Sequence, residues 1–214
     1  LYNYVQSKHS GAQTVESVAT QMENERKSEV SNYQKIAMSS IANLIAQDDG
    51  SNTEQLQNQA KSILRNLRFD DAGDTGYVFV YDVKGVNIAH GVNTSLEGKN
   101  LYDFKDPNGV YLIRELIDAA KNGGGYVQYS WKNTNGSVNP KIGYAALVPK
   151  WNWVLGTGFW ISGLEQQVAA TEQRVNEGID NAFINTIIAS VFAVAITAAI
   201  AVVVSRSITS PLHT

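Results

Sequence analysis

The feature that most constrains this sequence is an apolar segment near its C-terminus. Residues 184–204 are almost wholly apolar, and no charged residue occurs between Asn181 and Ser205. As an α-helix this segment would be about 31 Å long, which matches the roughly 30 Å thickness of a bilayer core. A chain of 214 residues rarely buries a helix that is apolar on every side within a soluble core. The segment is therefore predicted to be a transmembrane helix.

The charges on either side of this segment predict its orientation. Glu172, Glu177 and Asp180 precede it, whereas Arg206 follows it directly. Because positive charge marks the cytoplasmic side of a membrane, the C-terminus is expected inside the cell and residues 1–180 outside. The first residues have neither a basic nor an apolar run that would serve as a signal peptide. Since an exported domain needs an export element, we expect a second transmembrane helix upstream.

Composition and motif content exclude several classes of function. With 43% hydrophobic and 17% charged residues, the chain is not of a disordered type. The absence of cysteine excludes a disulfide scaffold, a zinc ribbon and a thiol nucleophile. A net charge of −3 without a basic run argues against a nucleic-acid partner. His9, His90 and His213 lack metal-ligand spacing, and no catalytic or cofactor-binding motif is present. We therefore expect no enzyme, no metal site and no cofactor.

Helical periodicity predicts long helices on both sides of a central region. One helix is expected over 12–47, and a second from an N-cap at Thr53 to about Phe69. A shorter helix is expected over 110–121, and a last one over 164–182 leads into the apolar segment. Apolar positions at near-heptad spacing in this last helix predict helix pairing and a homodimer.

Between these helices, aromatic and β-branched runs separated by turn residues predict an antiparallel sheet. The expected strands are 77–81, 86–90, 126–132, 141–148 and 153–160, with turns at 82–85, 133–136 and 149–150. The fold class is therefore α+β, with long N-terminal helices packed on an antiparallel sheet of five or six strands and followed by the transmembrane helix. The expected divisions are signalling helices at 1–70, the sheet at 71–162, a membrane-proximal helix at 163–183, the span at 184–204 and a cytoplasmic linker at 205–214.

Several residues of the predicted sheet have the chemistry of a pocket for a small carboxylate. Period-two alternation places Tyr129 and Trp131 on one face of their strand, and Lys141 opens an otherwise apolar strand. Taken alone, Lys141 is more simply a strand-end charge in water, His90 a structural histidine, and each aromatic residue part of the core. Taken together, aromatic walls, one cation and a hydrogen-bond donor are what a small carboxylate requires.

Seven short motifs occur in the order and spacing of a known family. They are Gly76–Asp82 (GYVFVYD), Ala89–Gly91 (AHG), Gly98–Leu101 (GKNL), Asp106–Gly109 (DPNG), Gly124–Val127 (GGYV), Lys141–Tyr144 (KIGY) and Trp151–Gly158 (WNWVLGTG). Over residues 12–165 the sequence resembles the single Cache domain of the second type, the extracytoplasmic sensor of bacterial methyl-accepting chemotaxis proteins. Beyond the apolar segment, Arg206–Leu212 (RSITSPL) resembles the start of a HAMP linker.

This resemblance implies a PAS-like sheet packed on the long N-terminal helix, with the pocket on the opposite face. It also implies a small organic acid as ligand, such as acetate, propionate, pyruvate, lactate or a C4 dicarboxylate. Lys141 would pair with the carboxylate, and His90 would donate a hydrogen bond to it or to another ligand oxygen. The pocket walls would be Tyr129 and Trp131, with Phe79, Tyr81 and Tyr144 near them.

Two of these assignments depend on local geometry. Lys141 and Tyr144 face opposite ways in a regular strand, so both line one pocket only if Gly143 permits a bulge. Arg114, on the predicted short helix, is either a second cation for the ligand or a solvated surface arginine.

As a sensor, the domain would close its loops around residues 92–108 on the ligand, shift the last strand, and move the helix that begins at Gly163. The resemblance places the receptor in the inner membrane, with the sensor in the periplasm. The same sensor could instead regulate a histidine kinase or a cyclic-dinucleotide enzyme. Alternatively, the domain could be a membrane-anchored interaction module without a small ligand, whose aromatic residues form a packed core. An exported hydrolase would need a catalytic motif that the sequence lacks.

Overall fold

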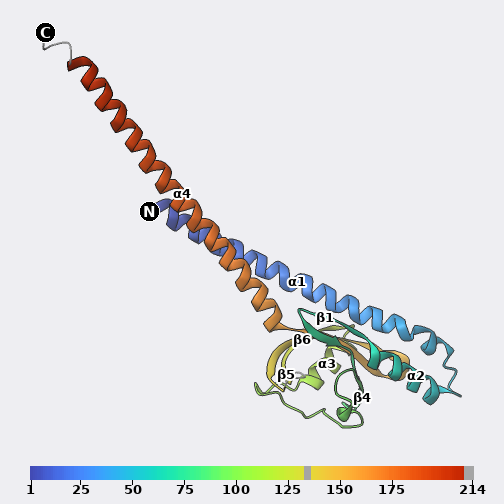
Figure 1. Cartoon of the computed structure of the whole chain (residues 1–214). Coiled ribbons are helices and arrows are strands. Elements are labelled where there is room, and N and C mark those ends of the chain that lie inside the picture. Colours follow the sequence, from blue (N-terminus) through green and yellow to red (C-terminus); the bar gives the residue numbers. More distant parts are fainter. Residues whose placement is uncertain (133–135, 210–214) are drawn as a thin grey trace. The chain divides into compact units, whose positions relative to one another are not determined.

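A computed structural model of the chain describes residues 1–132 and 136–209 (Figure 1). The chain divides into two compact units, one formed by Thr20–Gln167 and the other by Leu1–Ala19 together with Val168–Thr214. Most of the turn expected at 133–136 and the second half of the linker expected at 205–214 lie outside the described residues. Each unit is described by itself below.

The larger unit contains a five-stranded antiparallel sheet, which confirms the predicted fold class. Its strands are β3 (Phe79–Asp82), β4 (Asn87–His90), β5 (Gly125–Lys132), β6 (Val138–Val148) and β7 (Trp153–Trp160), in the order β4-β3-β7-β6-β5. Val148 pairs with Trp153 across a short 3₁₀ helix, Pro149–Trp151, so the predicted turn at 149–150 does connect two neighbouring strands.

A second, two-stranded sheet was not expected from the sequence. It is a hairpin of β1 (Arg68–Asp71) and β2 (Asp74–Tyr77), and it corrects both the expected helix over 53–69 and the expected strand over 77–81. The turn between the two strands uses positive φ angles at Ala72 and Gly73, 52° and 89°. The helical spacing of apolar residues in 53–66 continues weakly beyond the end of α2 at Asn66. The residues that follow form a strand instead, because β1 pairs with β2, and this pairing partner lies outside the stretch of sequence in which helical periodicity is read.

In the described part of the chain, four α-helices accompany the sheets: α1 (Tyr2–Gln47), α2 (Thr53–Asn66), α3 (Leu112–Lys121) and α4 (Ile161–Thr209). The first helix begins ten residues before the expected start at residue 12. Thr53 is the first residue of α2 rather than its N-cap, which is Asn52, and the Thr53 hydroxyl donates to Asp48 at 2.6 Å. The helices expected over 164–182 and 184–204 are parts of one continuous helix, α4.

The five-stranded sheet has a different apolar layer on each face. On one face, α1 and α2 bury Ile41 and Leu64 against sheet residues such as Val80 and Leu155. On the other face, α3 covers a layer that includes Phe79, Tyr81, Tyr129, Leu112, Ile113 and Leu116. This two-sided arrangement leaves the end of the α3 face that carries Lys141 and Trp160 outside the helix-covered core.

Three glycines on the α3 face leave room for neighbouring groups, two of them for aromatic rings and one for Lys141 and the β6 backbone. A Cβ atom added at Gly156 would lie 2.4 Å from the Phe79 ring, and one at Gly143 would lie 2.9 Å from the Tyr129 ring. At Gly158 an added Cβ would lie 2.5 Å from a backbone oxygen of β6 and 3.1 Å from Lys141 Cε. These rings and the Lys141 chain therefore lie close over β6 and β7 where a side chain would otherwise stand.

The smaller unit is a pair of helical segments from α1 and α4. The Tyr4 hydroxyl donates to Asp180 at 2.7 Å, and Lys8 forms an ion pair with the same carboxylate at 2.8 Å. A Cβ atom on Gly11 would lie 2.7 Å from Ile179, so glycine lets the two helices approach closely. The pairing predicted for the last helix thus occurs with α1 of the same chain, and these contacts extend α1 to Tyr2.

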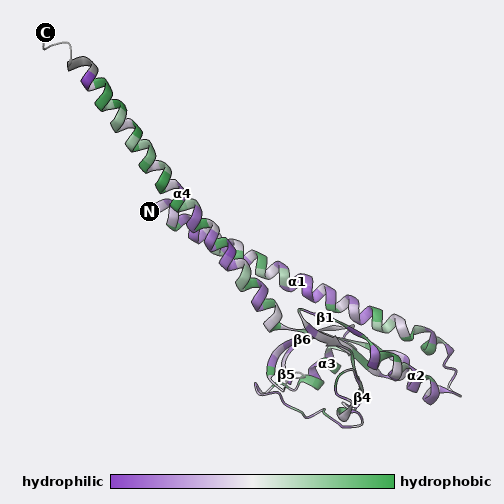
Figure 2. Cartoon of the chain, in the orientation of Figure 1, coloured by the Kyte–Doolittle hydropathy of each residue, from purple (hydrophilic) through white to green (hydrophobic). Residues whose placement is uncertain are grey.

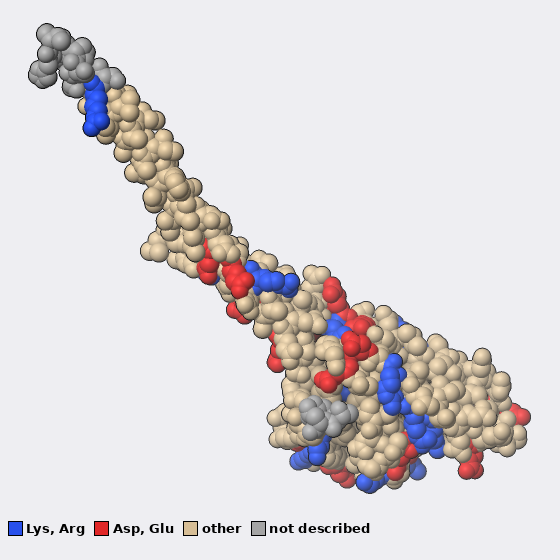
Figure 3. Space-filling model, in the orientation of Figure 1, with Lys and Arg blue, Asp and Glu red and all other residues tan. Residues whose placement is uncertain are grey.

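The apolar part of α4 has the properties of a membrane-spanning segment. Within Ile161–Arg206 an 18-residue window reaches a mean hydropathy of 2.8, and none of that window is buried. In Figure 2 the ribbon of this apolar part is coloured mostly green, as hydrophobic, and in Figure 3 no charged side chain is visible along it. By length and composition this helix can cross a membrane, and it is the one such helix in the described residues.

Candidate functional site

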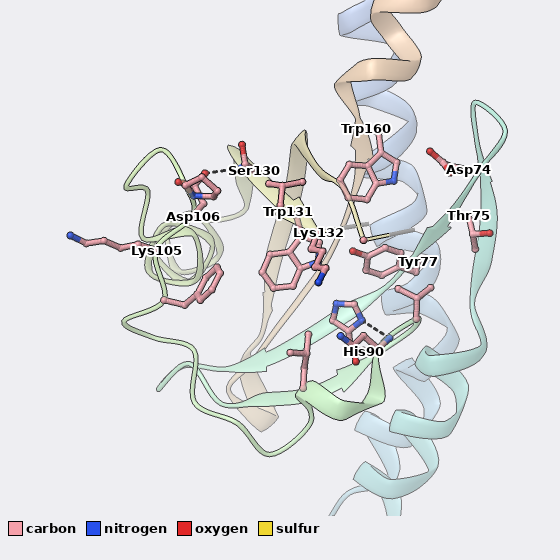
Figure 4. A pocket seen from close by; sticks show the side chains of 17 residues that line it. Asp74, Thr75, Tyr77, His90, Lys105, Asp106, Ser130, Trp131, Lys132 and Trp160 are labelled. Atoms are coloured by element: carbon pink, nitrogen blue, oxygen red, sulfur yellow. Dashed lines mark hydrogen bonds between the residues drawn. The ribbon is translucent and has the colours of Figure 1, made fainter. Parts of the chain in front are cut away.

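A pocket of about 880 Å³ opens on the α3 face of the sheet, at the end of β5 and β7. This volume falls within the range of about 300–1,000 Å³ that is usual for ligand sites. Its lining comes from β2, β4, β5, the start of β6, β7 and the loops that follow β4, and includes Asp74, Thr75, Tyr77, His90, Asn93, Phe104, Ser130, Trp131 and Trp160. In Figure 4, Tyr77, His90, Trp131 and Trp160 surround a common space, whereas Lys105 points away from it.

Lys141 lies on β6 directly opposite Trp160 of β7 and Tyr129 of β5. It is only 1% exposed, and its Nζ lies 4.0 Å from the centroid of the Tyr77 ring and 4.5 Å from that of Trp160. Lys141 is not itself among the residues that line the open pocket, but both of these rings are. The rings attract the ammonium through cation–π interactions and shield it from water.

The charge of Lys141 is poorly compensated. No carboxylate in residues 1–132 or 136–209 forms an ion pair with it, although the fields of Asp71 and Asp74 favour its charged form. Burial outweighs these fields and lowers the pKa of Lys141 from its ordinary 10.5 to about 7. An anion placed against this ammonium would therefore supply the ion-pair partner that Lys141 lacks among the described residues.

His90, at the end of β4, is held in one tautomer. Its Nδ1 accepts a hydrogen bond from the backbone N–H of Asn93 at 3.1 Å, so in the neutral ring Nε2 carries the proton. Burial, followed by the nearby charge of Lys141, lowers the pKa of His90 to about 4. The ring lies beside Tyr77, with centroids 4.8 Å apart, and near Trp131 at 6.4 Å. His90 is thus a neutral hydrogen-bond donor at the pocket.

The loop after β4 and the loop before α3 are each fixed by a carboxylate. Glu97 accepts the backbone N–H of His90 at 3.1 Å and forms an ion pair with Arg65 of α2. Asp106 accepts the backbone N–H of Ser130 at 2.7 Å and also two N–H groups of its own loop. These contacts hold the walls of the pocket against β4 and β5.

The other residues proposed from the sequence are placed as follows. Trp131 lines the pocket, and Phe104 packs against its ring at 5.7 Å. Tyr129, Phe79 and Tyr81 lie deeper, around a small cavity of about 10 Å³ whose walls also include Tyr77, His90 and Trp131. They therefore support the site from the core rather than line the main pocket.

Tyr144 and Arg114 lie away from the pocket. β6 pairs with both neighbours without a register break, so no bulge occurs at Gly143 and Tyr144 faces the α1 side. There its ring lies 4.8 Å from that of Tyr126 and packs beside Val30. Arg114 is on the exposed side of α3, where it pairs with Asp103 and lies over the Tyr111 ring.

Sequence reasoning missed Tyr77 and Trp160, the two rings on either side of the lysine. A signal for Trp160 was present, because a tight turn that pairs Val148 with Trp153 also pairs Lys141 with Trp160. No comparable signal pointed to Tyr77, since its position follows from the unexpected β1–β2 hairpin.

Comparisons with known proteins indicate the family to which the chain belongs. The sequence matches the model of the family described as Single Cache domain 2 over residues 22–174. It is 34% identical over 180 residues to "Sensor histidine kinase MctS" of Rhizobium johnstonii, covering 84% of this chain and 38% of that protein. It is 33% identical over 196 residues to "Methyl-accepting chemotaxis protein CtpM" of Pseudomonas aeruginosa, covering 88% of this chain and 33% of that protein. The chain thus spans about a third of the length of these curated relatives.

Solved structures share the fold of the larger unit. A crystal structure of a methyl-accepting chemotaxis protein from Vibrio parahaemolyticus is 40% identical, with a TM-score of 0.63, and the match covers 71% of this chain and 99% of that one. A structure described as showing carboxylic acid recognition by a Cache chemosensory domain is 24% identical, with a TM-score of 0.59, and the match covers 66% of this chain and 97% of that one. At this lower identity the likeness is one of fold.

Proposed function

The chain belongs to the Single Cache domain 2 family of sensor domains, which are not enzymes, and from this premise we propose that its pocket binds a short-chain carboxylate. The observation that carries this proposal is the buried ammonium of Lys141, which lies between two aromatic rings without a carboxylate partner in the described residues. A carboxylate at this position would gain a charge-assisted hydrogen bond from Lys141 and a second from His90 Nε2. Acetate, propionate, pyruvate and lactate are the candidate ligands.

Pocket walls and chemistry both support a small organic anion. Trp131, Trp160 and Tyr77 offer apolar surfaces for a short carbon chain, while Ser130, Thr75 and Asn93 offer polar groups for a hydroxyl or keto oxygen. The Cache domain described as recognising carboxylic acids has the same fold, which makes this ligand class compatible with the scaffold. An interaction module without a small ligand would not need a pocket of about 880 Å³.

Ligand binding would act through the conformation of the domain. The loops around residues 92–108 border the pocket and would close on the acid, and β7, whose last residue is Trp160, leads directly into α4. We expect a displacement of about 1–2 Å in this junction, as is typical of helix shifts in switching proteins. The size of the shift in population is set by the difference in ligand affinity between the two states.

For the whole protein, we propose a chemoreceptor of the inner membrane, with the sensor in the periplasm. The apolar length of α4 would cross the membrane, a second helix upstream would complete the anchor, and residues 205–214 would begin a HAMP linker. The receptor would act as a homodimer. A sensor histidine kinase is the second candidate, because one relative of that class is as similar to this chain as the chemotaxis protein is.

A thermal-shift screen tests the ligand class. The chain in detergent micelles would be heated with C2–C6 mono- and dicarboxylates, with tryptophan fluorescence as the readout and calorimetry on each hit. A rise in the melting temperature confined to one chain length is expected, because a ligand that binds only the native state stabilises it. No shift with any acid, in folded protein shown to be free of carried-over ligand, would contradict the proposal.

Two substitutions at His90 test its role as a donor. His90→Asn keeps an acceptor for the Asn93 N–H but has no group at the Nε2 position, so affinity for the bound acid should fall about 10- to 100-fold. His90→Gln places an amide N–H near the Nε2 position and should retain most of the affinity. Isothermal calorimetry at pH 6.5 measures both. Equal affinity in the wild type and His90→Asn would remove His90 from the proposed contacts.

A further inference from the structure

The β1–β2 hairpin, residues 68–77, contacts three functional parts of the larger unit at once. It adjoins α1, the junction between β7 and α4, and the pocket. Asp71, at the end of β1, is central to these contacts, and its side chain is only 1% exposed.

On the α1 side, the hairpin is held by a charge pair and a ring stack. Asp71 Oδ1 forms an ion pair with Arg26, which also pairs with Glu29 and lies over the Phe159 ring. Phe69 stacks on Tyr33 of α1, with ring centroids 4.1 Å apart and an interplanar angle of 16°. A rigid-body movement of the hairpin would therefore be transmitted to α1 through these two contacts.

On the α4 side, the same carboxylate contacts the start of the helix. Asp71 Oδ2 accepts the backbone N–H of Trp160 at 3.1 Å, and α4 begins at the next residue. The hairpin turn also touches this helix, because a Cβ atom added at Gly163 would lie 2.8 Å from Ala72 Cβ. One buried carboxylate thus bonds both to α1 and to the residue that precedes α4.

On the pocket side, the hairpin bears on Lys141. Tyr77, at the end of β2, lies under the ammonium at 4.0 Å, and Asp74 and Thr75 line the pocket. Among the protein charges that favour the ammonium form of Lys141, Asp71 is the strongest, followed by Asp74. Trp160 links the pocket to Asp71, because its ring contacts Lys141 and its backbone N–H donates a hydrogen bond to Asp71.

We propose that Asp71 is a positioning residue that couples occupancy of the Lys141 pocket to α1 and α4 through the β1–β2 hairpin. This inference rests on the proposed function, since it takes a carboxylate ligand as the event that is transmitted. Without ligand, Asp71 divides its negative charge between Arg26 and Lys141. A ligand carboxylate pairs with the Lys141 ammonium and compensates its positive charge, so the attraction between Lys141 and Asp71 weakens relative to that of Arg26 and the Trp160 N–H, and the hairpin moves with it.

Hydrogen–deuterium exchange on residues 1–214 in nanodiscs tests this coupling. Amide exchange over 160–167 would be compared with and without sodium acetate, propionate, pyruvate or lactate, each at saturation, and affinities would be measured by calorimetry. In the wild type, the acid that binds is expected to change exchange in this segment several-fold. In Asp71→Asn, which keeps the shape of the side chain, that acid should still bind within about tenfold of wild type, but the change over 160–167 should be lost.

Two further variants distinguish the proposed coupling through Asp71 from the general effect of removing a charge near Lys141. Asp74→Asn removes the neighbouring carboxylate on the same hairpin. Among the described residues Asp74 lines the pocket but forms no hydrogen bond or ion pair with α1 or α4, so this variant should retain the ligand-induced change over 160–167. Arg26→Gln removes the ion pair that joins Asp71 to α1, together with the Arg26 contacts to Glu29 and Phe159, but leaves the bond between Asp71 and the Trp160 N–H. It should reduce the ligand-induced change in exchange over 26–33 while leaving that over 160–167. A purely structural role of Asp71 would not shift the pH at which affinity declines, whereas Asp71→Asn should shift it to lower pH.

The outcomes distinguish the two proposals. If Asp71→Asn binds acid and keeps the full change over 160–167, the coupling role is wrong while the ligand assignment stands. If Asp71→Asn loses binding as completely as a Lys141 variant does, Asp71 belongs to the binding site and the coupling role is also wrong. If none of the four acids binds the wild type, the proposed function fails, and the coupling with it.

Discussion

Replacing Lys141 by methionine is expected to abolish carboxylate binding and at the same time to raise the melting temperature of the unliganded chain. The ammonium is fully buried and has no ion-pair partner in the described residues, so the native state bears its desolvation cost. Methionine fills a similar volume between Tyr77 and Trp160 without that cost. We expect a gain of about 2 kcal/mol, or roughly 4–8 °C in melting temperature, and at least ~100-fold weaker binding.

The stability gained by Lys141→Met should depend on pH. Between about pH 7 and 10.5 the unfolded chain keeps the Lys141 proton that the folded protein has lost, so wild-type stability rises with pH in this window. The advantage of Lys141→Met should therefore be complete below pH 7 and shrink toward pH 10.5. Tryptophan fluorescence on heating measures it.

Lys84→Met is the matched control for this substitution. Lys84 is an exposed lysine in the turn between β3 and β4, and the same exchange there should leave both binding and melting temperature nearly unchanged. A Lys141→Met variant that bound acid as tightly as the wild type would contradict the assigned role of Lys141. A variant that melted well below the wild type would show that the ammonium is compensated after all.

Affinity for the acid is expected to be flat between pH 6 and 7 and then to weaken about tenfold for each further pH unit. The free protein carries Lys141 with a pKa of about 7, and a bound carboxylate raises that pKa, so binding takes up a proton above pH 7. His90, with a pKa of about 4, stays neutral throughout, and simple carboxylic acids are ionised above about pH 6. The charged groups that act on Lys141 are the carboxylates of Asp71 and Asp74.

Calorimetry in buffers of different ionisation enthalpy measures this proton uptake directly. About one proton per ligand is expected at pH 8.5 and close to none at pH 5.5. Asp82→Asn, at the turn after β3, serves as a control that removes one carboxylate without touching the pocket lining. An affinity that did not change between pH 7 and 9 would mean that Lys141 remains fully charged in the free protein, or that it does not contact the acid.

Much of the fold could be predicted because the relevant signals are local. The apolar length 184–204, the periodicity of α1 and α2, and the strand runs with their turns all lie within short windows of sequence. Lys141 is unusual in an otherwise apolar strand, and the resemblance of local motifs implied Lys141, His90 and Trp131 as ligand contacts. All three lie in or against the pocket.

The errors arose where a side chain's surroundings depend on pairing at a distance. Tyr144 follows Lys141 by three residues and so faces α1 unless the strand bulges, and only the continuous register of β6 decided that it does not. Arg114 shares a helix with pocket-side residues, but its partner Asp103 comes from a preceding loop. The start of α1 at Tyr2 depends on its contacts with α4, more than 160 residues away in the chain.

By itself, the sequence determined the class of fold and the apolar helix, because composition and periodicity act through neighbours along the chain, and the resemblance of its short motifs indicated the family and implied Lys141 and His90 as ligand contacts. Only the tertiary structure decided that Lys141 lies between Tyr77 and Trp160, and that Asp71 bonds to both Arg26 and Trp160. These residues come from β1, β2, β6, β7 and α1, and their meeting depends on strand register and on an antiparallel hairpin. Such pairings are stabilised by contacts between distant segments, and no window of the sequence contains both partners.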